Sequence, residues 1–144
     1  MEYINTHSLV MNFTTLEPTE IAMDMNNQTQ SGLPRINEPA PDFTALTTDG
    51  EKSLSDYRGK WLVLFSHPAD FTPVCTTEFM AFAKAAPEFA KRNCELLGLS
   101  IDSIHSHIAW MRNIKQNFGV EIPFPIIEDL KMNVANAYGM IHPG

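Results

Sequence analysis

The chain has 144 residues, of which 44% are hydrophobic and 19% charged, so its composition is that of a folded globular protein and not of a disordered or collagen-like chain. Its net charge of −7 argues against nucleic acids and anionic membranes as partners, because both require clustered Lys and Arg. Its two cysteines, Cys75 and Cys94, form no Cys-x-x-Cys pair, which argues against a zinc ribbon or a disulfide-stapled secreted domain and favours the cytoplasm.

Residues 1–32 are rich in Asn, Thr, Met and Glu and have no helical or strand periodicity. We expect them to form a mostly disordered acidic tail. They contain no Lys or Arg, so they lack the positive region of a signal or transit peptide. No apolar run approaches the roughly 20 residues that a membrane span requires. The folded domain is expected to cover residues 33–144.

The folded part alternates short strand-like and helix-like segments. The predicted elements are a hairpin over 43–54 with its turn at Asp49-Gly50, a buried strand over 61–65, a helix after Cys75 that Pro87 kinks or divides, a strand over 96–101, a helix over 104–118 that ends at Gly119, a strand over 124–127 and a helix over 131–138. This order predicts an α/β fold with a central, mainly parallel sheet and flanking helices.

Cys75 lies between the predicted strand 61–65 and the helix that follows. Ligands of such sheets bind at the carboxyl ends of the strands. The first turn of a helix also offers unpaired N–H groups and the positive end of the helix dipole, which stabilise a thiolate. Most free cysteines are small buried hydrophobes, and that is the alternative. The polar neighbours Thr72, Thr76, Thr77 and Glu78 favour a nucleophile.

The segment 65–78 reads Phe-Ser-His-Pro-Ala-Asp-Phe-Thr-Pro-Val-Cys-Thr-Thr-Glu. It resembles the active-site segment of peroxiredoxins, with the Pro-x-x-x-Thr-x-x-Cys spacing at Pro68, Thr72 and Cys75. The resemblance extends over 33–144, and the His-Pro pair before the site is most similar to the one-cysteine, peroxiredoxin-6-like subgroup. It implies a thioredoxin-like fold and a cytoplasmic antioxidant peroxidase.

The resemblance also implies a role for each site residue. Cys75 would attack hydrogen peroxide or an organic hydroperoxide and become a sulfenic acid. Thr72 would hydrogen-bond the thiolate and the peroxide, and Pro68 would shield the sulfur. His67 would be a pocket residue near the cysteine, although a hydrogen-bonded loop histidine is an equal alternative. Glu78 would orient an arginine, or only complement the helix dipole.

The implied enzyme needs no metal or organic cofactor. An external thiol reductant, thioredoxin-like, glutathione or another, would recycle it, and we expect a homodimer or higher homo-oligomer. The chain reaches Gly144 where the family continues with further strands, a last helix and the active-site arginine. None of the four arginines matches that position: Arg35, Arg58, Arg92 and Arg112. We therefore expect the last strands and the last helix to be missing, a sheet edge to be left unpaired, and the chain to have little or no activity. The alternative function is a catalytically weak or inactive thioredoxin-like fragment that acts as a redox or interaction module.

Three further features have weaker chemical interpretations. Cys94 opens a strand and is expected to pack in the core, with a resolving cysteine as the minor alternative. His105 and His107 point to different sides of a helix start without a third ligand nearby in sequence, so we expect solvated histidines and no metal. A cysteine hydrolase built on Cys75 and His67 lacks an orienting Asn or Asp that the sequence can place.

Overall fold

The computed structural model describes the backbone of residues 8–12 and the whole of residues 33–141. The elements in chain order are β1 (Ser8–Asn12), β2 (Thr44–Thr47), β3 (Gly50–Ser53), the short 3-10 helix η1 (Leu54–Tyr57), β4 (Trp61–Ser66), α1 (Pro73–Ala90), β5 (Cys94–Ser100), α2 (Ile104–Phe118), β6 (Ile126–Glu128) and α3 (Asn133–Ala137). The predicted alternation of strands and helices is confirmed.

The strands form a single six-stranded sheet in the order β1-β4-β5-β6-β2-β3. Among the strands that the structure describes, the pairs β4–β5 and β5–β6 are parallel, whereas β1–β4, β2–β3 and β2–β6 are antiparallel. The expectation of a mainly parallel sheet was therefore wrong. The hairpin turn lies at Thr48–Asp49, one residue before the predicted Asp49-Gly50, because Thr47 pairs with Gly50, the first residue of β3. Strand β2 also pairs with β6, so the hairpin extends the sheet.

One part of the N-terminal stretch corrects the expectation for residues 1–32. Residues Ser8–Asn12 form strand β1, which pairs antiparallel with β4 along its whole length, from Ser8 opposite Phe65 to Asn12 opposite Trp61. Strand β1 thus covers this edge of β4 and satisfies the backbone groups that an open edge would expose. The remainder of the expected tail, 1–7 and 13–32, lies outside the described residues.

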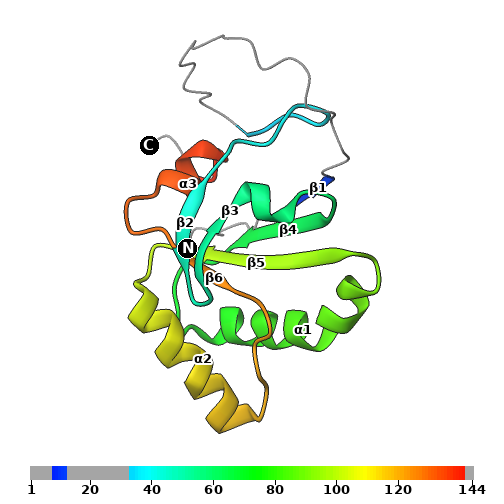
Figure 1. Cartoon of the computed structure of the whole chain (residues 1–144). Coiled ribbons are helices and arrows are strands. Elements are labelled where there is room, and N and C mark those ends of the chain that lie inside the picture. Colours follow the sequence, from blue (N-terminus) through cyan, green and yellow to red (C-terminus); the bar gives the residue numbers. More distant parts are fainter. Residues whose placement is uncertain (1–7, 13–32, 142–144) are drawn as a thin grey trace.

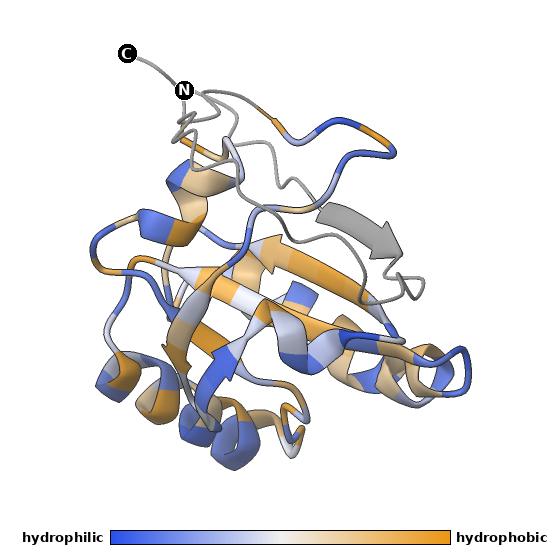
Figure 2. Cartoon of the chain, turned by 45° about the horizontal axis from the view of Figure 1, so that its top comes forward, coloured by the Kyte–Doolittle hydropathy of each residue, from blue (hydrophilic) through white to orange (hydrophobic). Residues whose placement is uncertain are grey.

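Alternating side chains of the central strands build a hydrophobic core on each face of the sheet. On β4, Leu62 and Leu64 contribute to the core shared with η1 and α3, whereas Val63 and Phe65 contribute to the core shared with α1 and α2. Figure 1 shows α1 and α2 on one side of the strands and α3 on the other. Hydrophobic residues gather on the central strands, and the helices carry both kinds of residue (Figure 2). Burial on both faces explains the continuous apolar run of β4.

The helix boundaries follow local chemistry. In α1, Pro73 occupies the first turn, where its missing N–H is not needed, and Pro87 lies in the last turn. We expected Pro87 to kink or divide the helix. It does not divide it, since α1 continues past Pro87 and ends three residues later at Ala90. Helix α2 ends at Gly119, whose φ of 67° lies in the left-handed region, as predicted.

The later elements are shifted or shorter than predicted. Strand β6 begins at Ile126, because Pro123 and Pro125 have no N–H to donate to a ladder. Helix α3 covers only Asn133–Ala137. Among the residues that the structure describes, no helix has both the length and the apolar character to cross a membrane.

Candidate active site

Cys75 lies in the first turn of α1, after the loop that follows the carboxyl end of β4. Thr72 is the N-cap residue, with extended backbone angles (φ −85°, ψ 145°), and Pro73 is the first helical residue. The Cys75 side chain faces the core between the sheet and the helices α1 and α2, and the residue is only 3% exposed. The sulfur is therefore shielded from bulk water while its residue lies near the unpaired N–H groups of the helix start.

The two threonines beside Cys75 make different contacts. Thr72 Oγ1 donates a hydrogen bond to the carbonyl oxygen of Ala69 at 3.1 Å. Thr76 Oγ1 donates to the carbonyl oxygen of Thr72 at 2.8 Å and accepts from Trp110 Nε1 at 3.2 Å. The hydrogen of Thr72 is thus directed to the loop, so the role implied for Thr72 would require its hydroxyl to rotate.

His67 follows β4 directly, and its backbone N–H donates to the carbonyl oxygen of Leu99 on the neighbouring strand. Its imidazole is buried between aromatic rings, 4.8 Å from Phe79 and 5.0 Å from Trp110 between ring centroids. Phe79 is one helical turn beyond Cys75, and Trp110 donates to Thr76, so both rings belong to the surroundings of Cys75. His67 Nε2 lies 2.8 Å from Asp70 Oδ1.

His107 corrects the expectation of a solvated helix start. Its ring is fully buried, with Nδ1 2.8 Å from Asp70 Oδ2 and Nε2 3.1 Å from the carbonyl oxygen of Ile127. Position in sequence could not reveal this contact, because Asp70 lies 37 residues earlier. His105, two positions before His107, is exposed as expected.

Asp70 is the centre of a buried polar cluster that the sequence reasoning missed. Its carboxylate meets His67, His107 and the hydroxyl of Ser106, which donates to Oδ2 at 2.8 Å. Burial alone would raise the pKa of Asp70, but the hydrogen bonds from His107, His67 and Ser106 outweigh it and hold that pKa well below its usual range. The Asp70 N–H also donates to Asp102 Oδ2 at 2.9 Å, which fastens the loop before α1 to the end of β5.

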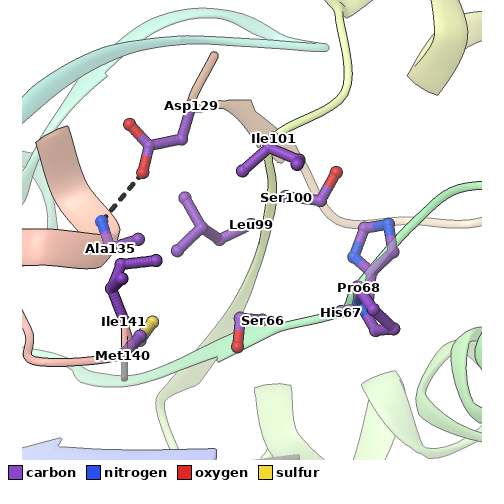
Figure 3. Close-up of a pocket in the computed structure, with 10 residues that line it drawn as sticks. All are labelled: Ser66, His67, Pro68, Leu99, Ser100, Ile101, Asp129, Ala135, Met140 and Ile141. Atoms are coloured by element: carbon purple, nitrogen blue, oxygen red, sulfur yellow. Dashed lines mark hydrogen bonds between the residues drawn. The ribbon is translucent and has the colours of Figure 1, made fainter. Parts of the chain in front are cut away.

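A pocket of ≈ 170 Å³ lies at the carboxyl ends of β4 and β5. Figure 3 shows His67 and Pro68 on one side of this pocket and Asp129 and Ala135 across it. Asp129 accepts the N–H of Ala135 at 2.8 Å, which anchors the start of α3. Cys75 is not among the lining residues, so the pocket adjoins the candidate site through His67.

The remaining candidate residues have simpler surroundings. Glu78 is half-buried on α1, and within the described residues its carboxylate forms no ion pair. Cys94 is half-buried at the start of β5 and packs against the core that contains Cys75, as predicted. Burial and the nearby Glu95 raise the pKa of the Cys94 thiol, which makes it a poor nucleophile at neutral pH.

Comparisons with known proteins agree with this geometry. A model of the AhpC/TSA family matches residues 36–144. A peroxiredoxin of Aquifex aeolicus is 67% identical over 112 residues, which cover 77% of this chain and 50% of that relative. Peroxiredoxin 2 of Caldanaerobacter subterraneus is 63% identical over 111 residues, with the same coverage of both chains.

Solved structures give the same result. A yeast mitochondrial 1-Cys peroxiredoxin matches with a TM-score of 0.71 and 52% identity, covering 76% of this chain and 52% of the other. Peroxiredoxin 6 of Arenicola marina matches with a TM-score of 0.67 and 40% identity, covering 74% and 50%. The chain spans about half the length of the curated relatives it matches. The chain belongs to the AhpC/TSA family, and its domain has the thioredoxin-like peroxiredoxin fold that the motif around Cys75 predicted.

Proposed function

We propose that the chain is a thiol-dependent peroxidase that reduces hydrogen peroxide and organic hydroperoxides at Cys75. The placement of Cys75 carries the proposal: it lies in the first turn of α1 beyond the carboxyl end of β4, and it is 3% exposed. The start of a helix offers unpaired backbone N–H groups and the positive end of the helix dipole, and the apolar surroundings of Cys75 limit access of water. The identity of 67% to a peroxiredoxin over 112 residues supports the same chemistry.

In the proposed reaction the Cys75 thiolate attacks one oxygen of the peroxide. An S–O bond forms and the O–O bond breaks, and the leaving hydroxide or alkoxide takes up a proton and departs as water or an alcohol. Cys75 is oxidised to a sulfenic acid while the peroxide is reduced. A thiol donor then condenses with the sulfenic acid to a mixed disulfide with loss of water, and a second thiol releases Cys75.

The other predicted residues take supporting roles in this proposal. Thr72 would hydrogen-bond the peroxide after rotation of its hydroxyl, and Pro68 would restrict access of water beside His67. Glu78 would orient the active-site arginine of the family, a position that none of the four arginines of this chain matches. The reductant would be a thioredoxin-like protein, glutathione or another thiol. The structural study of the yeast 1-Cys peroxiredoxin names glutathione/thioredoxin systems as its resolving route. We also propose that the protein forms a homo-oligomer and that it lies in the cytoplasm. The cytoplasm is proposed because Cys75 and Cys94 are both free thiols.

Peroxide consumption in the presence of dithiothreitol tests the proposal. The wild-type chain is compared with Cys75→Ser and with the matched control Cys94→Ser, which removes a thiol of raised pKa. We expect Cys75→Ser to reduce the rate to background and Cys94→Ser to retain it. A sulfenic-acid reagent should label Cys75 only after peroxide addition. Equal background rates for the wild-type chain and Cys75→Ser would refute the peroxidase.

Such a refutation would favour the second candidate, a redox or interaction module. Large apolar side chains at the carboxyl end of the sheet support it: Phe71 is 54% exposed, Val74 67%, Ile101 51% and Leu130 59%. Light scattering and a thermal melt would then separate a specific assembly, which melts cooperatively as a defined oligomer, from nonspecific aggregation.

A further inference from the structure

A second pocket, of ≈ 350 Å³, lies between α2, the turn of the β2–β3 hairpin and the loop before β6. Pockets that bind small molecules have volumes of about 300–1,000 Å³, so this pocket is large enough to hold one. The pocket beside His67, at ≈ 170 Å³, lies below that range. The larger pocket therefore has the size of a ligand site that is separate from the thiol.

The pocket uses a different face of α2 from the one that packs on the core. His107, Trp110 and Ile114 recur at three- and four-residue spacing and are at most 1% exposed. The residues of α2 that line the pocket form a second stripe with the same kind of spacing: Ile108, Met111, Arg112 and Lys115. Neither Cys75 nor any other residue predicted for its site lines this pocket. A ligand in the pocket is thus distinct from a peroxide at Cys75.

The charges in the pocket leave one positive group without a partner. Lys115 Nζ lies 3.0 Å from Glu121 Oε2, so these two side chains neutralise each other. Among the residues that the structure describes, Arg112 forms no ion pair, although it lines the same pocket. Helix α2 contains neither Asp nor Glu, whereas the whole chain has a net charge of −7. The pocket therefore presents one uncompensated cation, the guanidinium of Arg112.

The rest of the lining combines a hydroxyl group with an apolar wall. Thr48 Oγ1 accepts the N–H of Ile126 at 3.1 Å, and within the described part of the chain its own hydrogen has no acceptor. The apolar wall consists of Ile108 and Met111, which are half-buried, and Ile122, which is buried. An apolar lining with a small number of placed polar groups is typical of small-molecule sites.

We propose that this pocket binds a small apolar monocarboxylate, with its carboxylate on Arg112 and Thr48 and its hydrocarbon body on the apolar wall. A guanidinium offers a carboxylate two parallel hydrogen bonds. One negative charge matches the single uncompensated cation. A second charge, as on a phosphate ester, would meet Glu121 without a further cation to balance it. The ligand class is therefore a carboxylic acid with an apolar chain or ring.

Octanoate is the probe for this site, with acetate as the control for the charge alone and octanol as the control for the hydrocarbon alone. The ¹H–¹⁵N correlation spectrum of the ¹⁵N-labelled full chain is followed at neutral pH while each compound is added. We expect octanoate to cause saturable shifts of the amide signals of Thr48, Met111 and Arg112. Its affinity should exceed that of acetate and of octanol by about tenfold or more, because only octanoate uses both the wall and the cation.

Three results of the titration would overturn the proposal. The first is equal affinity for octanoate and acetate, which would leave the apolar wall without a role. The second is a set of shifts that does not saturate. The third is a set of saturable shifts centred on the pocket beside His67, which would place the ligand elsewhere.

The role of Arg112 is tested with Arg112→Met, which keeps a long side chain and removes the charge. The matched control is Arg58→Met, because Arg58 is also exposed, has no ion pair with any described residue and lies outside the pocket. Arg112→Met should weaken octanoate binding about tenfold, as expected for loss of a charge-assisted hydrogen bond, and Arg58→Met should not. Unchanged affinity in Arg112→Met, or equal losses in both variants, would contradict the assignment.

A thermal melt gives an independent readout on the same proteins. Octanoate should raise the Tm of the wild-type chain and of Arg58→Met, and it should not raise that of Arg112→Met. If Arg112→Met does not fold by circular dichroism, Arg112→Gln takes its place with the same expectation. An equal rise in every variant would overturn the proposal. Peroxide consumption is not among the readouts, so failure of the proposed peroxidase would leave this test unaffected.

Discussion

Phe79 fastens helix α1 to the sheet and to α2, so we expect Phe79→Ala to be among the most destabilising single changes in the chain. The side chain is 1% exposed, and its ring centroid lies 4.7 Å from that of Trp110, 5.3 Å from Phe65 and 5.5 Å from Phe124. Removal of a fully buried Phe ring costs about 3–5 kcal/mol, from lost transfer free energy and the cavity that remains. A typical domain has a total stability of only about 5–15 kcal/mol.

The measurement is urea unfolding followed by circular dichroism, together with a thermal melt. At roughly 4 °C per kcal/mol for a domain of this size, the Tm should fall by about 12–20 °C. The control is Phe118→Ala, the same deletion at a side chain that is 56% exposed at the end of α2, where a loss within about 0.5 kcal/mol is expected. Equal losses for the two variants would show that the packing around Phe79 does not stabilise the fold as argued.

Two further predictions concern the sheet and the buried carboxylate. Gly98→Val should destabilise by about 1–3 kcal/mol in urea unfolding, because a Cβ at Gly98 would lie 3.2 Å from Phe79 Cζ, and Phe79→Leu in the same chain should recover part of the loss. The pKa of Asp70 in the folded state lies below its ordinary value of 3.8. The ionised carboxylate of Asp70 therefore contributes its full stabilisation at a pH above 3.8, and this stabilisation is lost as the pH falls from 3.8 towards the folded-state pKa. Unfolding measured from pH 5 to pH 2 should therefore show a shallower acid loss for Asp70→Asn, and identical slopes would contradict the ionised state of Asp70.

Local patterns in the sequence were sufficient for most of the fold. The apolar run 61–65 predicted β4, the three- and four-residue spacing predicted α1 and α2, and Gly119 marked the end of α2. These features depend on neighbours within one or two turns, so they can be read from the order of residues. The motif from Pro68 to Cys75 predicted the family, which the comparisons confirm.

Contacts between segments that are distant in the sequence could not be predicted from these local patterns. The pairing of Ser8–Asn12 with β4 and the addition of β2 beside β6 depend on which sheet edges are left free. The burial of His107 depends on Asp70, which becomes its neighbour only when β4 and β5 pair in parallel and bring their carboxyl ends together. Residue order by itself thus determined the elements, the family and the position of Cys75. Only the tertiary structure brought His107 to His67 and Asp70 in one buried cluster, because a hydrogen bond between side chains 37 residues apart, such as that of Asp70 and His107, leaves no periodic pattern in a sequence.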